Sequence, residues 1–174
     1  IAMQKDPFRG QWALPGGLLG GEESAETAAT RQLETKTGVV APYLDQLHTF
    51  SEPNRDPFGR VVSVAYLALL PKVATTHSTT AKYAAVAWFP VSKLPELAYD
   101  HSTILKTAVS ALKERLGSSN IAYSLLPERF TLAELQALYE SILGHQLDKR
   151  NFRKKLAELK LLKKTGTKTA GGAH

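Results

Sequence analysis

A glycine-rich segment followed by charged residues is the part of the chain best suited to phosphate chemistry. The range Gly16–Gly21 contains four glycines, Glu23 follows it closely, and Arg31 comes eight residues after that glutamate. A loop of this kind ahead of a helix can approach a phosphate, and nearby carboxylates can hold a divalent cation against it. A glycine-rich loop alone is a weak motif, so its meaning depends on the residues in register with it.

A second candidate lies in the last third of the chain, where basic residues gather. Residues 1–120 hold 12 Lys and Arg against 11 Asp and Glu, a balance of +1, whereas residues 121–174 hold 10 against 5, a balance of +5. A solvated basic helix surface would explain this excess in an ordinary protein. A polyanionic partner would explain it equally, and the spacing of the charges favours that partner.

The basic residues fall at helical spacing over residues 148–159. A helix there would place Phe152 and Leu156 on one face, with Arg150 and Lys154 opposite them. Arg, Lys and Asn are the side chains that reach phosphates and base edges in a major groove. We expect DNA contacts from this helix and from a basic wing after it, made by Lys149, Arg150, Asn151, Arg153, Lys154, Lys163, Lys164 and Lys168.

Composition excludes several classes of protein. The 174 residues suffice for one sizeable core or two small ones, and with no cysteine there is neither a disulfide nor a thiolate metal site. Isolated histidines suggest no metal ligand. Neither a membrane-spanning apolar run nor a secretory signal pattern is present, which fits a cytoplasmic protein.

The elements that position the glycine segment form a first domain over residues 1–120. Apolar and β-branched runs predict strands, and amphipathic stretches predict helices, the first of them capped by Ser24 and ended by Gly38. Asp100 is expected to act as an N-cap or first-turn residue. The predicted helices are Ser24–Lys36 and Asp100–Leu116, and the predicted strands are Val39–Phe50, Arg60–Leu70 and Ala84–Pro90.

A second domain is predicted over residues 121–174. Helices are expected at Leu132–Leu143 and Asp148–Leu159, and Thr131 with Glu134 forms a capping box for the first of them. The short connection around Gly144 suits a helix-turn-helix. Residues after Leu161 are typical of the first arm of a β-hairpin wing, which we expect to be incomplete, just as the first domain is expected to lack its first strand.

The glycine segment and the helix after it resemble the Nudix superfamily motif. Its frame runs from Gly17 through Glu23 and Arg31 to Gly38 and Val39 without a gap. The resemblance implies a loop and helix that hold divalent cations against a diphosphate. The three glutamate positions of the motif are Gln32, Thr35 and Lys36 here. Because none of them is a carboxylate and one is a cation, the resemblance predicts repulsion of a metal ion and no bound cofactor.

Taken with the basic helix, the degenerate motif resembles the Nudix-related transcriptional regulators of the NrtR family. Segments that carry the likeness include Arg60–Tyr66, Trp88–Pro90, Leu97–His101 and Asp148–Arg153. The resemblance implies an α+β chain, in which a Nudix-fold mixed-sheet α/β/α sandwich precedes a winged helix-turn-helix. It also implies a homodimeric repressor of NAD-metabolism genes, released from a palindromic double-stranded DNA operator by ADP-ribose or a related nucleotide.

Several residues are candidates for contact with that nucleotide. Each has an alternative structural role. Arg31 could equally brace the loop, and Lys36 could equally be a solvated lysine at the helix C-terminus. Trp12 could be part of the core. The predicted set is Gly16, Gly17, Arg31, Lys36, Arg60 and Trp12.

Two alternatives stay open at this stage. The chain could be an active Nudix pyrophosphohydrolase of ADP-ribose or a nucleotide sugar, in which case residual Mg²⁺ would be needed. It could also be a binding module with neither activity.

Overall fold

The computed structural model describes residues 1–71, 85–119, 121–159 and 162. The chain divides into two compact units, Ile1–Arg129 and Phe130–His174. The first contains helix α1 (Ala25–Thr37), strands β1 (Tyr43–Phe50) and β2 (Ser63–Leu69), helix α2 (His101–Ser118) and the short 3₁₀ helix η2 (Ile121–Leu125). The second contains α3 (Leu132–Leu143) and α4 (Lys149–Leu159).

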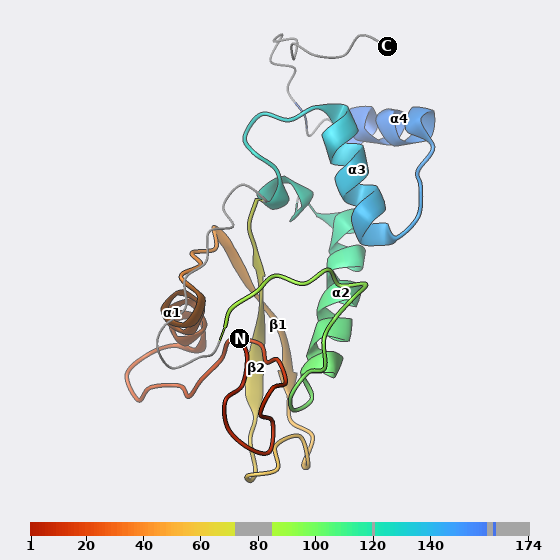
Figure 1. Ribbon diagram of the computed structural model, residues 1–174. Coiled ribbons are helices and arrows are strands. Elements are labelled where there is room, and N and C mark those ends of the chain that lie inside the picture. Colours follow the sequence, from red (N-terminus) through yellow and green to blue (C-terminus); the bar gives the residue numbers. More distant parts are fainter. Residues whose placement is uncertain (72–84, 120, 160–161, 163–174) are drawn as a thin grey trace. The chain divides into compact units, whose positions relative to one another are not determined.

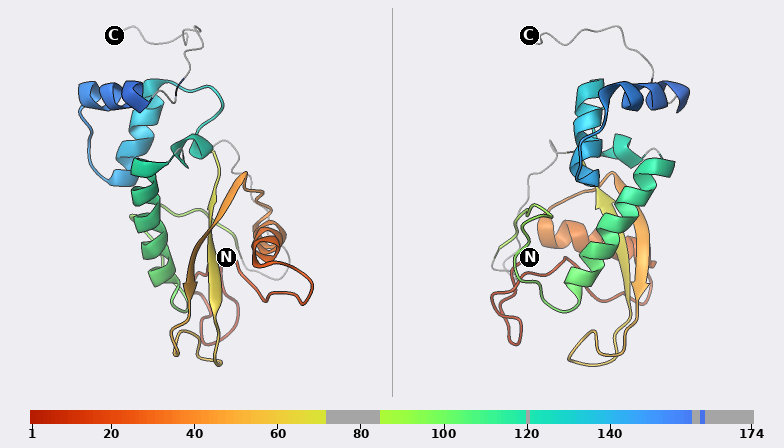
Figure 2. Two further views of the ribbon diagram at one scale, coloured as in Figure 1. Left: turned by 180° about the vertical axis from the view of Figure 1, so that it is seen from behind. Right: turned by 90° about the vertical axis from the view of Figure 1, so that its right-hand side faces the viewer.

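Strands β1 and β2 form an antiparallel pair that is packed between two helices. The pairing runs from Tyr43 opposite Leu69 to Phe50 opposite Ser63, with an irregularity between Gln46 and His48. Figure 1 shows α1 and α2 on opposite sides of this pair, and the left view of Figure 2 shows the same order from behind. The first unit thus has the helix, sheet and helix layers of the predicted sandwich.

The N-terminal segment adds extended chain to the first unit. Ala2 pairs with Trp12 in an antiparallel bridge, and Trp12 pairs with Leu97 in a parallel one, so the pairing is mixed. Ile1, Ala13 and Ala98 form a buried apolar cluster there. This segment leads directly into the glycine loop and therefore fixes where that loop begins.

The ends of α1 follow the predicted local chemistry. Ser24 has extended backbone and its hydroxyl accepts a hydrogen bond from the Thr27 amide, while Gly38 ends the helix at φ 70°. A hydroxyl that accepts from the first free amides stabilises a helix start, and only glycine adopts the left-handed region without a steric cost. Both predictions are confirmed.

One prediction for the first unit is wrong. Residues 85–90, the described part of the expected strand Ala84–Pro90, are not a strand, although the Ala85 carbonyl accepts from the Ala2 amide at 2.9 Å. Asp100 is the N-cap residue of α2, as predicted, but its side chain makes no capping hydrogen bond. Its carboxylate is paired with a distant arginine instead.

In the second unit the predicted helices and the capping box are confirmed. The Thr131 hydroxyl accepts from the Glu134 amide at 3.1 Å, and the Glu134 carboxylate accepts from the Thr131 amide at 2.7 Å. Leu135 is fully buried and Phe152 and Leu156 are nearly so, which places a small apolar core between α3 and α4. The expected wing, with Lys163, Lys164 and Lys168, lies outside the described residues.

Candidate nucleotide pocket and nucleic-acid interface

The glycine loop is closed by an ion pair. Glu23 accepts a hydrogen bond from the Gly20 amide at 2.7 Å and another from Arg31 Nε at 2.9 Å. The bond from Arg31 is the main reason why the pKa of the Glu23 carboxyl lies below its ordinary value, and the Gly20 amide lowers that pKa further. Glu23 and Arg31 therefore brace the loop.

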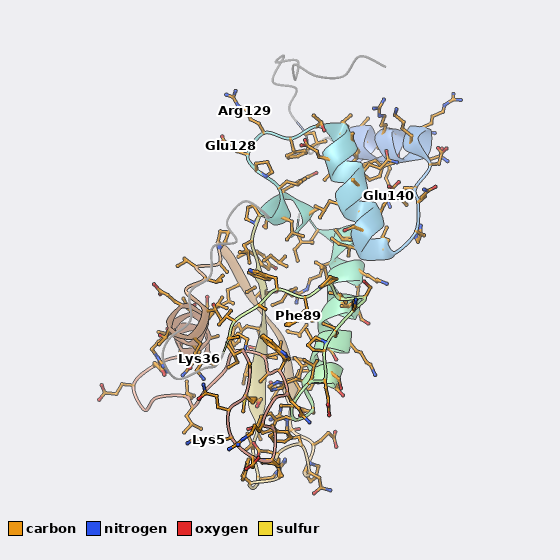
Figure 3. The ribbon with its side chains drawn as sticks, viewed as in Figure 1. Lys5, Lys36, Phe89, Glu128, Arg129 and Glu140 are labelled. Atoms are coloured by element: carbon orange, nitrogen blue, oxygen red, sulfur yellow. The ribbon has the colours of Figure 1, made fainter. Side chains whose placement is uncertain are left out.

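Residues that replace the metal-binding glutamates also hold this loop. The Lys36 ammonium donates to the Gly16 carbonyl, and Lys36 is labelled beside α1 in Figure 3. The side-chain amide of Gln32 lies against Gly17, in the space that a Cβ on Gly17 would occupy. An amide and an ammonium on α1 thus lie against consecutive glycines, and a side chain on Gly17 would require the end of the Gln32 side chain to move.

This donor set does not fit a divalent cation. Mg²⁺ in proteins is held by carboxylate oxygens, with the remaining positions taken by water or substrate phosphates. Within the described part of the chain, no group of three or more His, Asp or Glu side chains could hold a metal. Glu23 is already bonded to Arg31, and Lys36 adds a positive charge beside the loop. The metal-assisted chemistry that the Nudix frame supports elsewhere lacks its ligands here.

Two other predicted ligand residues contact different segments. The Arg60 guanidinium is exposed and donates to the carbonyls of Ser51 and Glu52 at 2.6 and 3.3 Å, so it closes the base of the β1–β2 loop. Trp12 is partly buried, and its ring makes an edge contact with Phe89 at 4.6 Å between centroids. Gly16, Gly17, Arg31 and Lys36 are brought together, whereas Arg60 and Trp12 have these other neighbours.

A buried polar cluster at the start of α2 was missed by the prediction. Arg55 donates two hydrogen bonds to the Asp100 carboxylate, at 2.9 and 2.7 Å, and the side chains are 5% and 20% exposed. His101 Nδ1 accepts from the Leu14 amide at 3.0 Å. The sequence predicts Asp100 as a helix N-cap or first-turn residue and does not predict its pairing with Arg55. The partners lie 45 and 87 residues away along the chain, so spacing gave no signal for them.

Burial lowers the pKa of His101 to about 4 from 6.5, although Asp100 acts in the opposite direction. The fold therefore favours the neutral imidazole, and its contribution to stability is present above pH 6.5 and lost as the pH falls towards 4. We expect the free energy of unfolding to decrease over this window, with His101 contributing at most about 3 kcal/mol.

The measurement is urea unfolding at several pH values for wild type and for His101→Asn, which does not titrate. The stability difference between the two proteins should change in favour of the variant as the pH falls from 6.5 to 4. A difference that stays constant with pH would contradict a neutral, buried His101.

Helix α4 has the two faces that its sequence predicts. Phe152 and Leu156 are buried, and the Phe152 ring contacts Tyr139 of α3 at 5.3 Å between centroids. The polar side chains on the rest of the helix are exposed. They include Lys155, a basic residue that the predicted set of DNA contacts does not contain. The exposed residues of this basic face are Lys149, Arg150, Asn151, Arg153, Lys154 and Lys155.

The connection between α3 and α4 is fixed by side-chain hydrogen bonds. Glu140, labelled on α3 in Figure 3, accepts from the Leu147 amide at 2.9 Å, and Gln136 donates to the Leu147 carbonyl at 2.9 Å. Asp148 then accepts from the Asn151 amide at 2.8 Å and caps α4. The turn is thereby held in one geometry, so the basic face has a defined direction relative to α3.

Two family models match successive parts of the chain. A NUDIX domain model matches residues 1–108, and the NrtR DNA-binding winged helix domain model matches residues 122–174. The predicted boundary at residue 120 falls between the two matches and remains a prediction.

Similar proteins include regulators and an enzyme. The ADPR responsive transcriptional repressor NtrR of Acinetobacter baylyi is 36% identical over 172 residues, which are 95% of this chain and 68% of the relative. The crystal structure of Shewanella oneidensis NrtR complexed with a 27mer DNA is 34% identical, with a TM-score of 0.81, covering 99% of this chain and 80% of that one. An ADP-ribose pyrophosphatase of Methanocaldococcus jannaschii is 34% identical over 106 residues, 61% of this chain and 62% of the enzyme.

The two matched domains define the class of this protein. It is a Nudix-fold chain joined to a winged helix, and its Nudix motif lacks the carboxylates that hold metal. The chain belongs to the NrtR family of Nudix-related transcriptional regulators. Among the helices that the structure describes, none is both long and apolar enough to cross a membrane.

Proposed function

We propose that this protein is a repressor of NAD-metabolism genes that binds operator DNA through α4 and is released by ADP-ribose or a related nucleotide. The observation that carries this proposal is the basic face of α4, which stays exposed while Phe152 and Leu156 anchor the opposite face. Positive side chains on a fixed helix can neutralise phosphates and read base edges in the major groove.

The first unit is proposed to bind the nucleotide and leave it intact. Its closed glycine loop presents Gly16 and Gly17, and the positive charges of Arg31 and Lys36 suit a diphosphate. Arg60 and Trp12 complete the proposed contacts. Because Lys36 supplies a positive charge where the family motif has a glutamate, we propose that binding needs no divalent cation.

The A. baylyi relative is named for its response to ADPR, and the S. oneidensis relative was crystallised with DNA. These relatives support both halves of the proposal. We further propose a cytoplasmic homodimer on a palindromic operator, because winged helices usually read symmetric sites as symmetric dimers. Lys163, Lys164 and Lys168 are proposed to extend the DNA contact of α4.

A gel-shift assay with the duplex upstream of the protein's own gene tests the proposal. The shift should weaken steeply as salt is raised, because each neutralised phosphate contributes a slope of about −0.9 to log K against log salt. Saturating ADP-ribose should abolish the shift. Binding that is insensitive to both salt and nucleotide would contradict the proposal.

The alternative, a pyrophosphohydrolase, has one observation in its favour, the similarity of the first unit to an ADP-ribose pyrophosphatase. Incubation with ADP-ribose and Mn²⁺, with products separated by chromatography, distinguishes the two. Turnover that is lost in Glu23→Gln would favour the enzyme. We expect the nucleotide to be recovered whole.

A further inference from the structure

Asp100, the last residue before α2, holds the β1–β2 loop. Its carboxylate accepts two bonds from Arg55, and the third donor of Arg55 reaches the Ser63 hydroxyl at 2.6 Å. Arg55 is only 9% exposed, so this ion pair is shielded from water and from competing ions. One guanidinium therefore joins the loop to both the beginning of β2 and the beginning of α2.

His101, the next residue, holds a different segment. Its Nδ1 accepts from the Leu14 amide, and Leu14 is followed by Pro15 and then by Gly16, the residue whose carbonyl receives Lys36. An imidazole accepts through Nδ1 only when it is neutral and carries its proton on Nε2. The glycine loop is thus held at its start by α2 and further along by α1.

Tyr99 immediately precedes both of these residues and has an unusual backbone conformation. Its backbone is left-handed, with φ 55°, a conformation that residues with a Cβ rarely adopt. Its ring contacts both Phe8 and His101, at 4.2 and 5.3 Å between centroids, and we take these contacts to maintain the conformation. Strained backbone of this kind persists where the surrounding structure determines it, and it is frequent at functional sites.

The geometry points to Asp100 and His101 as positioning residues that hold the glycine loop and the β1–β2 loop, which contains Arg60, in place for a diphosphate-containing nucleotide. This inference rests on the proposed function, because both segments carry proposed ligand contacts. Neither side chain needs to touch the ligand. Segments that are already held in their binding geometry lose less conformational entropy when the ligand binds. Asp100 and His101 therefore increase the affinity for the nucleotide.

The experiment compares two variants of nearly equal size in the full chain. His101→Asn keeps an acceptor near the position of Nδ1, whereas His101→Leu removes it. We measure the ADP-ribose Kd by calorimetry and the operator Kd without ligand by fluorescence anisotropy. His101→Leu should raise the ADP-ribose Kd about tenfold or more, through loss of preorganisation. His101→Asn should restore most of the affinity, and both variants should bind operator as wild type does.

The binding results distinguish failure of this inference from failure of the proposed function. Wild type that fails to bind ADP-ribose would overturn the proposed function together with this inference. Wild type that binds while His101→Leu binds equally well would overturn the inference alone. If His101→Leu does not fold, Arg55→Lys gives the corresponding test, since it keeps the charge but loses the two-point contact with Asp100. An ADP-ribose Kd unchanged in Arg55→Lys would then refute the inference.

Discussion

Replacing Arg150 and Lys154 together by alanine is expected to weaken operator binding by about 100-fold or more, since Arg contacts to bases contribute roughly 1–3 kcal/mol and phosphate contacts add to this. The two side chains are exposed four residues apart on α4, opposite the buried Phe152. The salt dependence should also become less steep, by about one unit of slope for each lost phosphate contact. Anisotropy titrations at several salt concentrations measure both effects.

The matched control is Lys106→Ala with Lys113→Ala, which removes two exposed cations from α2. A general electrostatic attraction to DNA would be weakened about equally by either pair. A specific interface on α4 predicts that the control changes the operator Kd less than about threefold, because charges outside the interface are screened at physiological salt. Equal losses for the two pairs would show that α4 is not the interface.

Leu135→Ala is expected to lower the free energy of unfolding of the second unit by about 2–5 kcal/mol, the usual cost of truncating a fully buried leucine. Leu135 is 0% exposed. The second unit is small, and its total stability is expected to be roughly 2–7 kcal/mol. A large fraction should therefore unfold near 37 °C and operator affinity should fall, while ADP-ribose binding by the first unit persists.

Leu132→Ala is the control, because the same truncation is made on the same helix at a side chain that is 39% exposed. Leu132→Ala should lower the free energy of unfolding by less than about 1 kcal/mol, since surface substitutions have small effects. Urea unfolding followed by a probe in the second unit compares the two variants. Similar losses in both would contradict the core assigned between α3 and α4.

The features that could be predicted from the sequence are those with local causes. Ser24 caps α1 through an amide three residues away, and Thr131 and Glu134 form their box within one turn. The two faces of α4 follow equally from helical spacing. In each case the residues that interact are neighbours along the chain, so their types and order were sufficient.

Interactions between distant segments could not be predicted in this way. Asp100 has the residue type of a helix cap, but the fold brings Arg55 to it, and a buried guanidinium is a stronger partner than a capping amide. The loss of the metal-binding carboxylates could be read directly, yet the contact of Lys36 with Gly16 depends on how the loop returns to α1. The expected strand Ala84–Pro90 is not formed at its described residues, 85–90, because an apolar run does not specify a pairing partner.

The most direct test measures the release of a labelled operator duplex from the wild-type protein by fluorescence anisotropy. ADP-ribose is added to the complex in the presence of EDTA, so that no divalent cation is available. The nucleotide is then recovered and analysed by chromatography. A metal-free sensor predicts that the duplex is released in EDTA as readily as in Mg²⁺ and that ADP-ribose is recovered intact. Release that requires Mg²⁺, or that occurs only as ADP-ribose is converted to AMP and ribose phosphate, would contradict it.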